Sequence, residues 1–82
     1  MKSKRTGKIL NTYAIFDPAK EGGYNVSFPS FPGCATFGAT FEEAKKMATE
    51  ALSLWVEELR SQKVPIFSQD VRPIVDEISL AI

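Results

Sequence analysis

The side chains that usually perform catalysis are scarce in this sequence of 82 residues. It contains no histidine, so neither an imidazole base nor a histidine metal ligand is available. Cys34 is the only cysteine, and a single thiolate can build neither a thiolate metal site nor a disulfide within the chain. Gly22-Gly23 is a turn signal and not part of a phosphate-binding loop. The residue types therefore predict a protein without catalytic groups, cofactor or metal.

Cys34 remains a possible free nucleophile. No residue beside it in the sequence would lower the pKa of its thiol. Small apolar positions at strand starts are a common place for such a cysteine. We therefore expect Cys34 to be a small buried residue.

The charged residues balance overall but are unevenly distributed. Ten basic and ten acidic residues cancel, which argues against a general nucleic-acid-binding protein. Residues 9–82 carry six basic and ten acidic residues, a net charge of −4, which suits a basic partner. The remaining basic residues lie in or beside an N-terminal arm, 1–7, that we expect to be flexible and able to contact phosphate: Lys2, Lys4, Arg5 and Lys8.

The length and composition predict one small domain, over residues 8–82, after the arm 1–7. A domain of this size buries only about 60% of its unfolded surface, so without a disulfide or a metal it gains from forming a homodimer or homotetramer. No apolar run approaches the roughly 18 residues of a membrane helix, and no signal peptide follows the basic start. A single cysteine fits a reducing compartment. We expect a cytoplasmic protein that associates with itself.

Stretch 24–28 predicts the central strand, because apolar residues alternate with polar ones: Tyr24, Val26 and Phe28 against Asn25 and Ser27. We expect a strand over 8–16 before it, after which the glycine-rich turn 17–23 follows. A proline-rich corner after the central strand leads to a short strand over 34–37. Strands joined by such turns form an antiparallel meander.

A single helix is predicted to follow. Thr40 and Glu43 have the spacing of a capping box, and the helix should run to about residue 60 or 61. Its apolar stripe, which includes Trp55 as a core residue, should cover one face of the sheet: Phe41, Ala44, Ala48, Ala51, Leu52, Trp55 and Leu59.

The segment 71–82 predicts a last strand. Ile74, Ile78 and Leu80 share one parity, and Pro73 fits an edge or a strand start. The order is then β-β-β-α-β, an α+β fold in which we expect the fourth strand to lie parallel to the first. The face of the sheet away from the helix has little to cover it, which favours pairing between subunits. Whether the last strand pairs within one chain or between two is left open.

This order of elements is also the opening of the ribonuclease H fold, whose nucleases hold two metal ions with acidic residues on adjacent elements. The first strand carries no carboxylate over 8–16, and Asp17 lies at a turn. The other candidates belong mostly to the polar side of the helix: Glu42, Glu43, Glu50, Glu57 and Glu58. These residues are better explained as a solvated helix face than as a metal site.

Four motifs at their spacing resemble the HicB-like (UPF0150) antitoxin family over roughly residues 8–67. They are Tyr13-x-x-Phe16-Asp-Pro, Glu21-Gly-Gly-Tyr24, Phe28-Pro-x-Phe-Pro-Gly-Cys34 and Gly38-x-Thr40-x-Glu42-Glu43-Ala44. The resemblance implies a degenerate, partial ribonuclease H-like fold without the nuclease acids. It also implies a non-catalytic antitoxin of a type II toxin–antitoxin pair. Such an antitoxin binds and inhibits a small basic HicA-like mRNA ribonuclease.

Many members of that family carry a C-terminal helix-turn-helix or ribbon-helix-helix module that binds DNA. No such module is present in residues 1–82, so direct DNA binding by these residues is not expected.

Three residues are predicted to contact a protein partner because they lie in turns and combine charge with an aromatic anchor: Asp17, Glu21 and Phe31. An alternative hypothesis is a stand-alone nucleic-acid-binding or regulatory oligomer that uses the basic arm with Lys2, Lys4, Arg5 and Lys8. A vestigial nuclease is a third.

Overall fold

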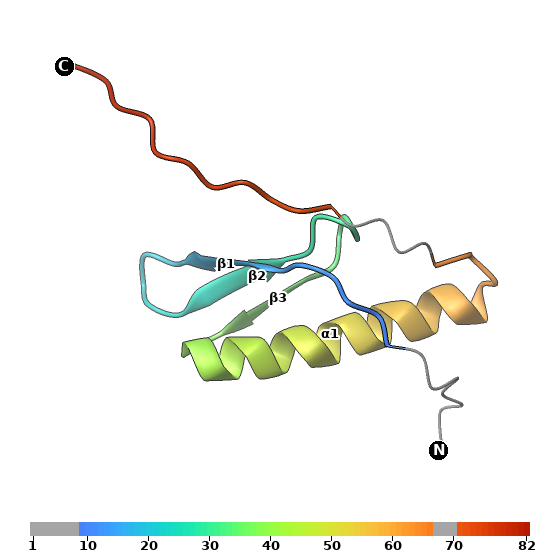
Figure 1. Cartoon of the computed structure of the whole chain (residues 1–82). Coiled ribbons are helices and arrows are strands. Elements are labelled where there is room, and N and C mark those ends of the chain that lie inside the picture. Colours follow the sequence, from blue (N-terminus) through green and yellow to red (C-terminus); the bar gives the residue numbers. More distant parts are fainter. Residues whose placement is uncertain (1–8, 67–70) are drawn as a thin grey trace.

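The computed structural model describes residues 9–66 and 71–82 (Figure 1). It contains three strands and one helix: β1 (Ile15–Pro18), β2 (Tyr24–Ser27), β3 (Ala35–Gly38) and α1 (Phe41–Ser61). The strands pair antiparallel in the order β1-β2-β3. The predicted antiparallel meander followed by a single helix is confirmed.

β1 differs from its predicted bounds because the hairpin turn is tighter than the sequence indicated. The backbone N–H of Ala19 donates to the carbonyl of Gly23 at 2.9 Å, so the turn begins only at Ala19. Asp17 and Pro18 therefore pair with β2 instead of lying in the turn. Pro18 is tolerated there because β1 is an edge strand, where a missing N–H leaves no ladder bond unmade. Residues 9–14, predicted as strand, form no ladder.

The helix begins where the capping pattern predicted. Thr40 is the N-cap, and its Oγ1 accepts a hydrogen bond from the N–H of Glu43 at 3.0 Å. Glu43 reaches back one residue further than in the usual box, since its Oε1 accepts from the N–H of Ala39 at 2.7 Å. Both bonds satisfy donors at the β3–α1 junction, and this fixes the angle at which the helix leaves the sheet.

Thr40→Ala is expected to destabilise the fold by about 1 kcal/mol, because it leaves the N–H of Glu43 without its acceptor. Thr49→Ala is the matched control. The Thr49 hydroxyl only donates to the carbonyl of Lys45 on the exposed side of the same helix, at 3.2 Å. Urea unfolding of the two variants measures the difference. Equal midpoints would show that the cap contributes nothing.

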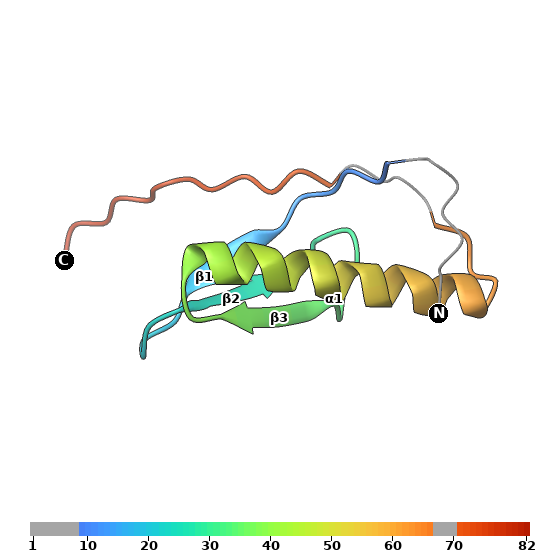
Figure 2. The same ribbon diagram turned by 90° about the horizontal axis from the view of Figure 1, so that it is seen from below.

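The core lies between α1 and one face of the sheet (Figure 2). Ala44 and Ala48 are buried on the helix, and their small side chains let the helix axis approach the strands. The other buried members come from β2 and from the corner that follows it: Val26, Phe28, Phe31 and Cys34. Trp55, predicted as core, is half-buried and packs against this cluster.

The predicted fourth strand is not confirmed. Residues 71–82 are extended, but they belong to no sheet, and the described residues contain only the three paired strands. The segment starts beside the domain and then leaves it, as both views show (Figures 1 and 2). The apolar alternation predicted a strand, and the backbone here is extended but pairs with no other described strand (Figure 1). The alternation does not specify which chain supplies the pairing partner.

Candidate partner-binding surface

The hairpin between β1 and β2 presents two of the three predicted contact residues. Asp17, in β1, and Glu21, in the turn that follows, are both exposed, as predicted. Asp17 pairs with Asn25, and Asn25 pairs with Phe37, so the three residues form one row across the sheet. Successive side chains of a strand point to opposite faces, which places this row on the face away from the helix.

We call that side of the sheet the outer face, and it consists of two rows of side chains: Ile15, Ser27 and Ala35, then Asp17, Asn25 and Phe37. Phe37 is 47% exposed and Ile15 is 36% exposed. Tyr13, 45% exposed, extends the surface beyond the start of β1. Helix α1 covers the opposite face (Figure 2), so these apolar side chains meet solvent in the part of the chain that the structure describes.

Phe37 is held in place by the glycine of the hairpin. A Cβ on Gly23 would lie 2.5 Å from Cζ of Phe37, so the ring packs directly over this glycine. Gly23 also has φ = +81°, a conformation that other residues rarely adopt. The hairpin turn therefore both closes the ladder and packs against an exposed aromatic ring in the same row as Asp17.

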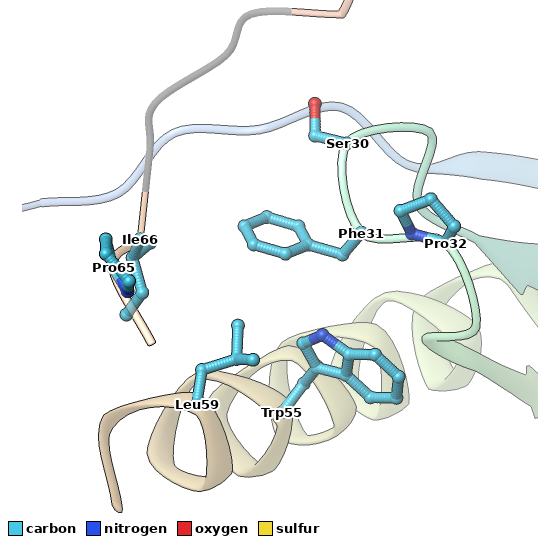
Figure 3. Close-up of a pocket in the computed structure, with 7 residues that line it drawn as sticks. All are labelled: Ser30, Phe31, Pro32, Trp55, Leu59, Pro65 and Ile66. Carbon is cyan, nitrogen blue, oxygen red and sulfur yellow. The ribbon is translucent and has the colours of Figure 1, made fainter. Parts of the chain in front are cut away.

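Phe31, predicted from its turn position to be an exposed aromatic anchor, is instead 7% exposed and belongs to the core. Two successive turns cause this. The N–H of Phe31 donates to the carbonyl of Phe28, and the N–H of Cys34 donates to the carbonyl of Phe31, both at 3.0 Å. They fold the proline-rich corner toward the helix, and the ring points into a pocket (Figure 3).

This pocket has a volume of about 260 Å³ and lies between the corner, the end of α1 and the residues after it. Gly33 allows the corner to approach the helix, because a Cβ there would lie 3.1 Å from Cη2 of Trp55. The hydroxyl of Ser30 accepts a hydrogen bond from the N–H of Val71 at 3.4 Å. The lining is otherwise mainly apolar and suits an apolar side chain: Ser30, Phe31, Pro32, Trp55, Leu59, Pro65 and Ile66.

The three predicted contact residues do not converge on one site. Asp17 and Glu21 belong to the hairpin at one end of β2, whereas Phe31 lies in the corner at its other end (Figure 1). The outer face adds three residues that the contact prediction missed: Tyr13, Ile15 and Phe37. The sequence did not distinguish them, because exposed apolar residues of a strand resemble core residues until the position of the helix is known.

None of these groups forms a reaction centre. Across residues 9–66 and 71–82, no three metal-ligating side chains come together. Cys34 is 3% exposed, and its burial raises the pKa of the thiol above the ordinary value of 9.0. The uncharged thiol is favoured because a thiolate would lose its hydration in this position. The surface can bind a partner through apolar contacts and carboxylates, but it offers no activated nucleophile.

The basic arm falls outside the described residues. Lys2, Lys4, Arg5 and Lys8, predicted as nucleic-acid contacts, all lie in segment 1–8. Their role stays a prediction.

Comparison with known proteins decides which class of protein carries this surface. Residues 13–77 match the model of a family described as the HicB-like antitoxin of bacterial toxin–antitoxin systems. The chain belongs to the HicB-like antitoxin family. The match includes all three strands, the helix and residues 71–77 of the extended segment.

Two relatives show how the HicB-like domain occurs in proteins of different length. A UPF0150 protein from Synechocystis sp. is 33% identical over 75 residues, which is 92% of each chain. An antitoxin named HicB 1, from Photorhabdus laumondii, is 56% identical over 45 residues. Those residues are 55% of this chain but only 29% of that antitoxin.

Membership in the HicB-like family favours a non-catalytic regulator over an enzyme. Among the described residues, no helix is long and apolar enough to cross a membrane.

Proposed function

We propose that this chain is the antitoxin of a type II toxin–antitoxin pair and that it binds and inhibits a small, basic, HicA-like mRNA ribonuclease. The observation that carries the proposal is the family match over residues 13–77.

Charge supports a basic partner. Residues 9–82 carry ten acidic and six basic side chains, so the domain has a net charge of −4. Complementary charge raises the rate at which two proteins meet and selects against partners of the same sign. A basic ribonuclease is the kind of partner that such a domain attracts.

The outer face supports a protein contact of this kind. It combines exposed aromatic and aliphatic side chains with a carboxylate and two small polar side chains. Exposed aromatic residues are frequent anchors at protein interfaces, and neighbouring charges set orientation. We propose that the toxin lies on the outer face, with Asp17 and Glu21 at the rim. Phe31 is not part of this contact, because its side chain lies in the core.

A charge-reversal experiment tests the placement of the toxin. Asp17→Lys combined with Glu21→Lys is expected to weaken binding of the toxin by roughly tenfold or more, mostly through a slower association rate. The toxin is obtained by co-purification from the native cell and identified by mass spectrometry. Surface plasmon resonance at two salt concentrations measures the affinity and its dependence on charge.

Glu50→Lys combined with Glu57→Lys is the matched control, because both residues are exposed on α1, away from the outer face. It changes the net charge by the same amount. An equal loss of affinity in both double variants would show that only the total charge matters, and the placement on the hairpin would be wrong.

Two further features belong to the same proposal. We infer that a fourth strand joins the three described strands and that the resulting fold is a partial ribonuclease H-like fold. We also place the protein in the cytoplasm, where the mRNA substrate of such a toxin is found.

A further inference from the structure

The segment 71–82 is the most unusual feature of the described surface. Five large aliphatic side chains in it are almost entirely exposed, at 82% or more: Ile74, Val75, Ile78, Leu80 and Ile82. Single exposed aliphatic residues are common, but a continuous exposed apolar segment marks a surface that is covered by something. The segment is also extended, which is the conformation of a strand without its neighbour.

Its sequence has the pattern of a strand with one buried face. Ile74, Ile78, Leu80 and Ile82 share one parity, which Asp76 alone interrupts. Glu77, Ser79 and Ala81 share the other parity with Val75. Such alternation predicts a half-buried strand at the side of a sheet, with the first set turned toward a core.

The sheet has a suitable place for that strand along β1. β1 pairs only with β2, so its other edge is open. Three residues in β1 and in the extended stretch before it face the helix side: Leu10, Ala14 and Phe16. They pack against the core but are only half-buried. The hydroxyl of Thr12, in the same row, is buried and has no hydrogen-bond partner in the structure. A further strand there would complete this row.

The position of the helix explains why the helix-facing side chains along β1 are only partly covered. α1 packs chiefly on β3 and secondarily on β2, and Phe41 at its start contacts Phe16 of β1. Phe41, whose ring lies 5.0 Å from that of Phe16, remains 47% exposed. An apolar strand beside β1 would cover both rings from the open side.

The chain's own segment does not occupy this place. The first residues of the segment lie beside the start of β1, where the guanidinium of Arg72 is 5.8 Å from the ring centre of Tyr13. The N–H of Val71 donates to Ser30 at the same end of the sheet. From there the segment runs in the general direction of β1 but diverges from it, and in both views its end lies away from the domain (Figures 1 and 2).

We propose that residues 74–82 are donated to a second copy of this chain, where they form the strand beside β1, and that the exchange is reciprocal. Nine residues of strand span roughly 30 Å, which is enough to cross from one small domain to the next. Exchange of identical elements between two subunits closes a symmetric dimer without a new complementary surface. The outer face stays free in this arrangement, so the inference goes beyond the proposed antitoxin function and does not depend on it.

The area that the exchange buries is sufficient for a stable dimer. Each tail brings four large aliphatic side chains of one parity, at roughly 100 Å² of apolar surface apiece. Two tails together with the surfaces that receive them bury on the order of 1,600 Å², which is the usual size of a specific interface. Backbone hydrogen bonds along β1 would fix the register of the donated strand.

Sedimentation equilibrium of the full chain tests the proposal. We expect a mass twice the 9.1 kDa of one chain. Ile78→Asp combined with Leu80→Asp should return the mass to that of one chain and weaken association by at least a hundredfold. Ser79→Asp, on the opposite parity of the same segment, should remain dimeric. A monomeric full chain, or equal behaviour of the two variants, would overturn the proposal.

A second measurement separates exchange between copies from pairing within one chain. Equal amounts of ¹³C,¹⁵N-labelled and unlabelled protein are mixed in the unfolded state and refolded together, so that mixed dimers form. Isotope-filtered nuclear Overhauser spectra should then show contacts from the methyl groups of Ile78 and Leu80 in one copy to residues 10–16 of the other. Contacts found only within one copy, or a dimer whose tails give no contacts, would contradict the exchange.

Discussion

Gly38→Ala is expected to lower the stability of this domain by about 3 kcal/mol or more. Gly38 is buried at the end of β3, directly before the helix. A Cβ there would lie 2.3 Å from the backbone N of Ala44 and 2.4 Å from its Cα. Backbone atoms cannot move aside as a flexible side chain can. The added methyl group therefore has to push α1 away from the sheet, at a cost in core packing.

Thermal unfolding followed by circular dichroism measures the effect. For a domain of this length the loss corresponds to a fall in Tm of roughly 12 °C or more. Ala35→Ser is the control, because it also adds one heavy atom to β3 but at an exposed position on the outer face. Its stability should stay within about 0.5 kcal/mol of the parent. A Tm of Gly38→Ala within 2 or 3 °C of the parent would mean, at roughly this sensitivity, that the close strand–helix approach is not required.

Phe31→Ala is expected to cost about 3–5 kcal/mol, which is the usual range for removing a buried aromatic side chain. Phe31 is both a core residue and a wall of the pocket, so its loss joins the pocket to the core and removes part of the cluster against which Trp55 packs. Native proteins are stable by only about 5–15 kcal/mol. We expect this variant to be close to unfolding at room temperature, with a greatly reduced midpoint in urea.

Pro32→Ala is the matched control for Phe31→Ala. Pro32 is the next residue and lines the same pocket, but it is exposed. Its replacement should change the stability by no more than about 1 kcal/mol. If the two variants were equally stable, the corner would be a surface loop, as its composition first indicated.

The local structure of this protein follows closely from its residue types. Alternation around Val26 predicted the central strand, and the Thr40–Glu43 spacing predicted the start of the helix. These features depend on neighbours within a few residues, where propensity and capping chemistry decide the outcome. The antiparallel meander followed because turns on both sides of β2 leave few other ways to pair three strands.

Features that depend on distant contacts were harder to predict. Phe31 lies in a proline-rich corner, a composition typical of exposed loops, yet two successive turns and the approach of Gly33 to Trp55 bury its ring. The segment 71–82 shows the same limit. Its parity predicts a strand, but a pattern with period two does not indicate whether the neighbouring strand comes from the same chain.

The candidate surface was predictable only in part. Composition pointed correctly to Asp17 and Glu21 as exposed residues. It did not single out Phe37, whose ring belongs to the outer face and packs over Gly23. Partner surfaces built from exposed aromatic residues resemble core positions in sequence. Only the position of the helix shows which face of the sheet is left open.

The central claim, that this chain is an antitoxin, is tested most directly by ribonuclease inhibition. The protein that co-purifies with it is incubated with a labelled mRNA, and the purified chain is added in increasing amounts. We predict that cleavage stops once the two proteins are equimolar, and that the Asp17→Lys, Glu21→Lys variant needs a higher concentration. Undiminished cleavage in the presence of excess chain, by a partner that binds it, would contradict the antitoxin function.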